Sequence, residues 1–151
     1  MEDGFGTYIK ISKIPIKEKS IINIGDSYLA FSYNINLNNN NNNKSRKFLF
    51  LKIINKDREY EPVILGKDKN EYTIGRTKIS DITIDDILLS KINCCLNYEK
   101  DTWYIQDGNQ KGKPSTNGTW LYSSEDYEIF DGMIFKSNKY NFCCNLSKKI
   151  F

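Results

Sequence analysis

The feature that most constrains this chain is a series of short strand-like segments, each closed by a turn signal, that begins at Phe48. Apolar, β-branched and aromatic runs between Gly-, Asn- and Asp-containing turns are typical of strands. No window of about a dozen residues shows the 3.6-residue apolar period of a helix. We therefore predict an all-β fold, an antiparallel β-sandwich. The predicted strands are Phe48–Ile54, Pro62–Leu65, Glu71–Ile74, Ile82–Ile84, Cys94–Tyr98, Trp103–Gln106, Thr119–Tyr122, Met133–Ser137 and Asn141–Leu146.

Composition narrows the classes of function. The 151 residues are enough for one domain with one core. A net charge of +3, from 22 basic and 19 acidic residues, is too small for a protein that coats nucleic acid. No apolar run approaches the roughly 18 residues of a membrane span. We expect neither nucleic acid nor membrane as a partner.

Histidine is absent and the four cysteines form two adjacent pairs, Cys94-Cys95 and Cys143-Cys144. Without histidine, Ser-His-Asp and Cys-His sites and His-ligated metals are excluded. Adjacent cysteines lack the spacing of zinc ligands, and neighbours in a strand point to opposite faces. We expect one inward and one outward thiol in each pair, reduced in an intracellular compartment, nuclear or cytoplasmic.

Three segments differ in composition. Residues 1–37 contain short β-like runs, such as Tyr8–Ile11 and Ser27–Phe31. Residues 38–47 begin with six asparagines and read as a linker or loop. Residues 48–151 hold the predicted sandwich.

The first segment also resembles the end of the chain. Gly6–Ile9, Gly25–Leu29 and Tyr33–Leu37 follow one another as do Gly118–Leu121, Asp131–Phe135 and Tyr140–Phe142. Two interpretations remain open. The first segment supplies the closing strands of a second, incomplete unit of the same fold, or two β-rich stretches are similar by chance.

Two loops offer donors for a phosphate. Gly75-Arg76 ends a predicted strand and presents a planar guanidinium that can hold two phosphate oxygens. Fourteen residues after that arginine, Ser90-Lys91 adds a hydroxyl, a backbone N–H and an ammonium.

A third segment, Ser115-Thr116-Asn117-Gly118, contains the Asn-Gly pair that favours a tight turn. Such a turn exposes the Thr116 hydroxyl and the Asn117 amide. An amide both donates and accepts hydrogen bonds, and so suits the backbone of a bound peptide.

These three motifs, in this order and spacing, resemble the forkhead-associated (FHA) family from about Phe48 to Leu146. The resemblance implies an FHA-type sandwich that binds phosphothreonine-containing proteins and needs no cofactor or metal. It assigns the phosphate to Arg76 and Ser90, with Lys91 beside them. It assigns the phosphothreonine pocket to Thr116 and the peptide backbone to Asn117.

The same resemblance makes Gly75, Gly118, Ser115 and Asn93 structural supports of the site. Asn93 stands where the family usually has histidine. Asparagine can still bridge two backbone groups, over a shorter reach. The alternative is a degenerate FHA fold that binds other proteins independently of phosphate.

We expect a monomer that is not an enzyme. Asp85-Asp86, Asp26 and Glu125-Asp126 are the carboxylates that catalysis could use. Nothing in the sequence sets two of them across a cleft, as glycosidase chemistry requires, and we interpret all of them as solvated turn residues.

Overall fold

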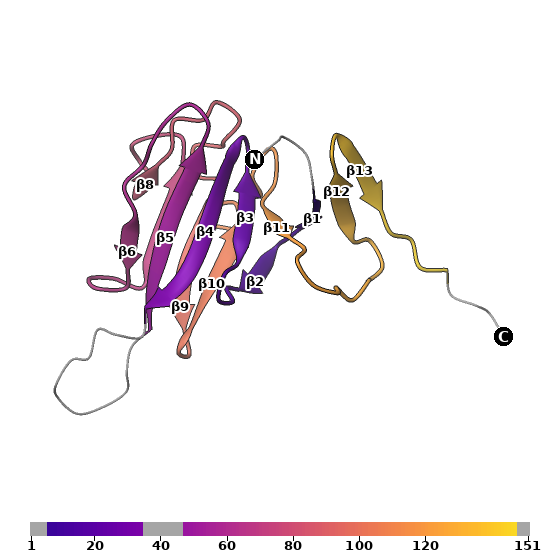
Figure 1. The fold of residues 1–151 in the computed structure, drawn as a ribbon, viewed down its shortest axis with the longest axis horizontal. Coiled ribbons are helices and arrows are strands. Elements are labelled where there is room, and N and C mark those ends of the chain that lie inside the picture. The colour runs from indigo at the N-terminus through magenta and orange to yellow at the C-terminus, as the bar shows by residue number, and fades with distance from the viewer. Residues whose placement is uncertain (1–5, 35–46, 148–151) are drawn as a thin grey trace.

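The computed structural model describes residues 6–34 and 47–147, which form strands and no helix (Figure 1). The predicted all-β fold is confirmed. In the described part of the chain, no helix is long and apolar enough to span a membrane. The strands are β1 Thr7–Lys10, β2 Lys13–Pro15, β3 Ile21–Ile24, β4 Ser27–Asn34, β5 Phe48–Asn55, β6 Val63–Leu65, β7 Glu71–Gly75, β8 Ile82–Thr83, β9 Cys94–Glu99, β10 Thr102–Asp107, β11 Trp120–Tyr122, β12 Ile134–Ser137 and β13 Tyr140–Cys143.

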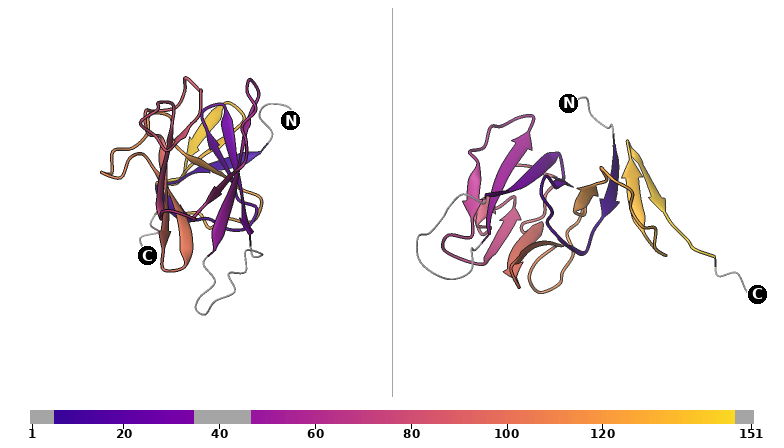
Figure 2. Two further views of the ribbon diagram at one scale, coloured as in Figure 1. Left: turned by 90° about the vertical axis from the view of Figure 1, so that its left-hand side faces the viewer. Right: turned by 60° about the horizontal axis from the view of Figure 1, so that its bottom comes forward.

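The strands form two sheets that face each other (Figure 2). The larger sheet has the order β13-β12-β1-β11-β3-β4-β5-β6, and all its neighbours are antiparallel. The smaller sheet has the order β2-β10-β9-β7-β8, in which only β7 and β8 are parallel. The predicted antiparallel sandwich therefore contains one parallel pair.

The four N-terminal strands are distributed over both sheets. Strand β3 pairs with β11, and β4 pairs with β5 from Ser27↔Asn55 to Asn34↔Phe48. Strand β2 lies beside β10 in the smaller sheet. Hydrogen bonds thus join the N-terminal strands to the later ones. The division into 1–37, 38–47 and 48–151 stays a prediction, and the asparagine tract lies outside the described residues.

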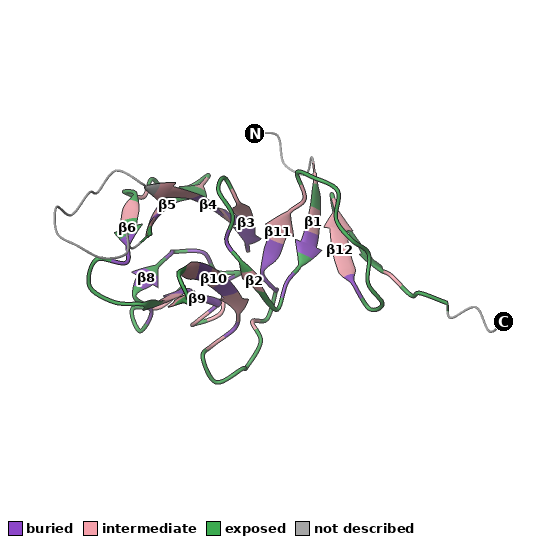
Figure 3. Cartoon of the chain, turned by 90° about the horizontal axis from the view of Figure 1, so that it is seen from below, coloured by how far each residue is buried: buried purple, intermediate pink, exposed green. Residues whose placement is uncertain are grey.

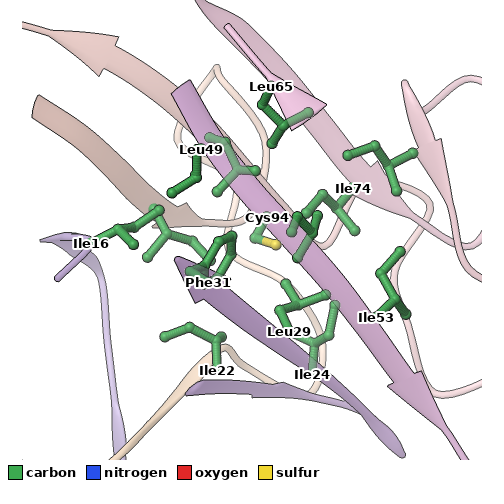
Figure 4. Packing of buried hydrophobic residues seen from close by; sticks show 14 of the residues in the cluster. Ile16, Ile22, Ile24, Leu29, Phe31, Leu49, Ile53, Leu65, Ile74 and Cys94 are labelled. Carbon is green, nitrogen blue, oxygen red and sulfur yellow. The ribbon is translucent and has the colours of Figure 1, made fainter. Parts of the chain in front are cut away.

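The core lies between the two sheets and follows from alternation along the strands. In β5, Leu49, Leu51 and Ile53 point inward, and Leu29 and Phe31 of β4 lie beside them (Figure 4). The smaller sheet contributes the opposing layer. Its residues in the core cluster are Ile74, Ile82, Cys94, Leu96, Trp103 and Ile105.

Cys94 points into the core and Cys95 lies on the other face of β9, as predicted, but the expectation that one thiol of this pair is exposed is wrong. Cys94 and Cys95 are both buried, because the segment after β10 covers the outer face of β9 and the Cys95 thiol lies 3.3 Å from the Gly108 carbonyl oxygen. At the other pair, Cys143 is exposed and Cys144 is half-buried. All four are free thiols.

One hairpin extends beyond the two-layered part. Strands β12 and β13 lie outside β1, where the smaller sheet does not reach (Figure 3). All four residues of β13 are exposed. The exposed large apolar residues of this region are Tyr127, Ile129, Phe130, Tyr140, Phe142 and Leu146.

Candidate functional site

The first part of the site lies at the end of β7, where Gly75 allows two backbones to approach closely. A Cβ at Gly75 would lie 2.0 Å from the Lys91 carbonyl oxygen, so no other residue fits there. The Ser80 hydroxyl donates to the same oxygen at 2.8 Å. The Arg76 N–H donates to the Ser90 carbonyl at 3.1 Å. This packing holds Arg76 next to Ser90 and Lys91.

The second part is the turn that carries Thr116 and Asn117. The Thr116 N–H donates to the Ser90 Oγ at 2.9 Å, and the two hydroxyl oxygens lie 3.2 Å apart. The Asn117 Nδ2 donates to the Leu88 carbonyl at 2.8 Å. The structure therefore brings all five residues predicted to contact the phosphopeptide to one place.

Asn93 connects the Ser90 loop with the segment after the Asn117 turn from a buried position. It is fully buried, its Oδ1 accepts from the Ser90 N–H at 3.2 Å, and its Nδ2 lies 3.4 Å from the Thr119 hydroxyl. Its backbone N–H donates to the Ile74 carbonyl. One amide thus bridges the Ser90 loop and the segment that follows the Asn117 turn.

The other supports converge on Asp107, the last residue of β10. Its carboxylate accepts from the Ser115 hydroxyl at 2.6 Å and from the Thr119 hydroxyl at 2.7 Å. Ser115 in turn accepts from the Gly118 N–H at 2.9 Å. The sequence signal was available, because Asp107 ends the Trp103-x-Ile105-x-Asp107 strand immediately before this loop.

Asp86 corrects a prediction. It was interpreted as a solvated turn residue, yet it is 6% exposed. Its Oδ2 accepts from the Asp26 N–H and the Ser27 hydroxyl, both at 2.8 Å, and its Oδ1 accepts from the Leu88 N–H at 2.9 Å. A buried carboxylate needs such donors. Asp86 therefore ties the β3–β4 turn to the loop that leads to Ser90.

Between the loops lies a pocket of about 570 Å³. Three cations, Arg76, Lys91 and Lys113, contribute to its lining, which contains no carboxylate. Within residues 6–34 and 47–147, none of these three forms an ion pair. The rest of the lining is polar or apolar: Ile79, Ile87, Leu88, Leu89, Ser90, Ile92, Asn109, Pro114, Thr116 and Asn117.

Two residues near the site, Asp81 and Cys94, have shifted pKa values. Burial raises the pKa of Asp81, but hydrogen bonds from Lys69 and Thr73 outweigh it and lower that pKa overall. Asp81 is thus a carboxylate held by its own partners beside the Arg76 loop. Burial raises the pKa of the Cys94 thiol well above its usual range, which favours the neutral thiol over the thiolate.

The comparisons with known proteins agree with this geometry. No curated protein and no solved structure matches the chain significantly. One family model does, the FHA domain, over residues 72–136. That range contains Arg76, Ser90, Thr116 and Asn117, and the observed two-sheet architecture is consistent with the family's β-sandwich. Residues 72–136 therefore match the FHA domain, and FHA domains are phosphopeptide-binding modules for protein interactions.

Proposed function

We propose that this domain binds segments of partner proteins that carry phosphothreonine, and that the pocket between the Ser90 loop and the Asn117 turn receives the modified residue. The observation that carries the proposal is the charge of that pocket, which has three cations and no carboxylate in its lining. A phosphate dianion accepts several charge-assisted hydrogen bonds and needs such a setting.

Each residue has a part in this proposal. The Arg76 fork and the Lys91 ammonium neutralise the phosphate, while the Ser90 hydroxyl supplies a neutral donor. The hydrogen bond from Asn117 Nδ2 to Leu88 orients the amide, so that its oxygen can accept from a peptide N–H. The proposed role is binding alone, with no reaction at the site.

Preference for threonine over serine would come from the apolar part of the lining. Leu88, Ile92 and Pro114 line the same pocket as the hydroxyl donors and can receive the γ-methyl group. Burial of one methyl is worth on the order of 1 kcal/mol, which corresponds to roughly five-fold in affinity. The proposal therefore expects a modest preference over phosphoserine.

Calorimetric titration tests the proposal with a peptide selected from a degenerate phosphothreonine library. The comparison series contains the unphosphorylated peptide, the phosphoserine peptide and the variant Arg76→Ala. Loss of a charge-assisted pair of hydrogen bonds should weaken binding by about 10- to 100-fold. A rise in ionic strength should weaken it further.

Lys52→Ala is the matched control, because Lys52 is an exposed cation on β5 that does not line the pocket. The Lys52→Ala variant should bind the phosphothreonine peptide with the affinity of the wild type. Binding that ignores phosphorylation, salt and Arg76 would instead establish the alternative, a phosphate-independent interaction module.

A further inference from the structure

One row of apolar side chains crosses the larger sheet and continues past the end of the smaller one. Residues that lie opposite each other in an antiparallel pair point to the same face. The row runs from Ile22 through Leu121, Ile9 and Phe135 to Phe142. Ile22 belongs to the core between the sheets, and Leu121 packs against that core. Phe135 and Phe142 therefore lie on the core face of the larger sheet, beyond the strands that the smaller sheet covers (Figure 3).

This uncovered end of the core face is aromatic. The Phe135 and Phe142 rings are stacked, with their centroids 4.9 Å apart. Tyr140 points to the same face as Phe142, because side chains alternate along β13. Phe130 precedes β12 and lines a cavity together with Gln106 of the smaller sheet, so it lies on the same side. We call Phe130, Phe135, Tyr140 and Phe142 the aromatic surface.

The aromatic surface is open to solvent and carries no charged side chain. Phe130, Tyr140 and Phe142 are 48%, 59% and 46% exposed. The remaining residue of β12 and β13 on this face is Ser137. The only charged residue of the two strands, Lys136, points to the opposite face by the same alternation. A second copy can therefore meet this face without repulsion between like charges.

We propose that the aromatic surface is the interface of a homodimer, in which the β12–β13 hairpin of a second copy takes the position that the smaller sheet has over the rest of the larger sheet. Two such hairpins face each other as the sheets of a sandwich do. A twofold axis parallel to the strands sets Phe135 of one copy over Phe142 of the other, and keeps both smaller sheets outside the interface. None of the four residues lines the phosphate pocket, so this inference does not depend on the proposed function.

The exposed area fits a weak dimer. An aromatic side chain has about 200 Å² of surface, so Phe130, Tyr140 and Phe142 together leave about 300 Å² exposed in each copy. Two copies bury about 600 Å² of apolar surface, and since apolar atoms form about 60% of an interface, its total area is about 1,000 Å². That area is at the lower limit for a specific interface. We therefore expect a dissociation constant of about 10–100 µM, and the expected monomer in dilute solution.

Sedimentation velocity of the full chain, from about 5 to about 500 µM, tests the proposal. The expected result is a shift from monomer to dimer across that range. Phe142→Asp places a carboxylate at the centre of the surface and should weaken association at least about tenfold. Phe130→Ala removes one ring from its border and should weaken association by about three-fold.

Ile64→Asp is the matched control. Ile64 is 37% exposed on β6, at the opposite edge of the same sheet, and this variant should dimerise as the wild type does. Thermal denaturation at low concentration shows whether each variant is folded. A folded wild type that stays monomeric throughout, or a dimer that forms equally well in folded Phe142→Asp, would overturn the proposal.

Discussion

The hairpins β3–β4 and β12–β13 have the same local construction and opposite surroundings. Each has a two-residue turn whose first residue is left-handed, Gly25 with φ 56° and Asn138 with φ 55°. Each carries an apolar pair across its strands, Ile22↔Leu29 and Phe135↔Phe142. Leu29 is fully buried between the sheets, whereas Phe142 is exposed on β13, the edge strand of the larger sheet.

The comparison teaches that a hairpin's own sequence does not decide whether it becomes core or edge. Strands β3 and β4 lie between β11 and β5, with the smaller sheet opposite them. Within the described residues, β12 pairs with β1 on one side and with β13 on the other, and β13 has no further neighbour. Coverage by the smaller sheet therefore decides which of the two hairpins is buried. Three predictions test how far this difference affects stability and binding.

The largest expected difference is in stability. Leu29→Ala removes a fully buried side chain and should lower the free energy of unfolding by about 2–5 kcal/mol. Phe142→Ala should cost less than about 1 kcal/mol, because its side chain is already in contact with water. Urea denaturation of both variants measures the difference. Similar losses would mean that the outer hairpin is packed as tightly as the inner one.

The second prediction concerns the connection between the inner hairpin and the site. Asp86→Asn replaces a buried carboxylate that holds the β3–β4 turn against the Leu88 loop, and should cost about 1–3 kcal/mol of stability. It should also weaken phosphopeptide binding, because Asn117 is hydrogen-bonded to that loop.

Asp131→Asn is the counterpart at the outer hairpin. The Asp131 carboxylate is exposed and accepts one backbone N–H, from Leu146 at 2.9 Å. Its replacement should cost about 0.5 kcal/mol or less and leave binding intact. Urea denaturation of the two variants measures the effect on stability, and peptide titration measures the effect on binding. Equal effects on affinity would show that the inner hairpin does not position the loop.

The smallest effect is a dependence of stability on pH that arises where the two hairpins meet. Lys136 of β12 donates to the Asn23 Oδ1 of β3 at 2.6 Å, and burial lowers the pKa of its ammonium to about 8. Between about pH 8 and 10.4 the unfolded chain keeps a proton that the folded chain has released. Stability should therefore rise with pH across that window.

The rise should be of order 1 kcal/mol at most, because Lys136 is only half-buried and solvent screens its charge. It should end near pH 10, since burial raises the pKa of Tyr8 to about 12 and the unfolded tyrosine loses its proton first. Thermal denaturation across this range, with Lys136→Met against the exposed Lys139→Met, measures the slope. An unchanged slope in Lys136→Met would rule out this lysine as its source.

The sequence predicted the strands from Phe48 onward closely, because turn residues separate them and alternation marks their faces. The expected Phe48–Ile54 and Cys94–Tyr98 are the observed β5 and β9 to within a residue. The spacing along the chain singled out the motif residues Arg76, Ser90 and Asn117, and the structure brings them to one pocket. Their role in binding stays a prediction.

What the sequence could not predict depends on contacts between distant residues. Asp85 and Asp86 look alike in sequence, but only Asp86 meets the backbone of Asp26, 60 residues away. Cys95 is buried by a loop that follows another strand. The internal similarity stays a prediction. It matched Gly25–Leu29 to Asp131–Phe135, whereas the turns of the two hairpins match Gly25 to Asn138.

The place of β1 has a consequence for how the chain reaches this structure. β1 lies between β11 and β12, with Ile9 opposite both Leu121 and Phe135. Pairings between such distant segments are slow to form, because a long loop must close before any contact is gained. During synthesis, β3, β4 and β5 can form a local meander early. Strand β1 can pair only after β11 and β12, near the other end of the chain, have been made. We expect docking of β1 to be a late step of folding.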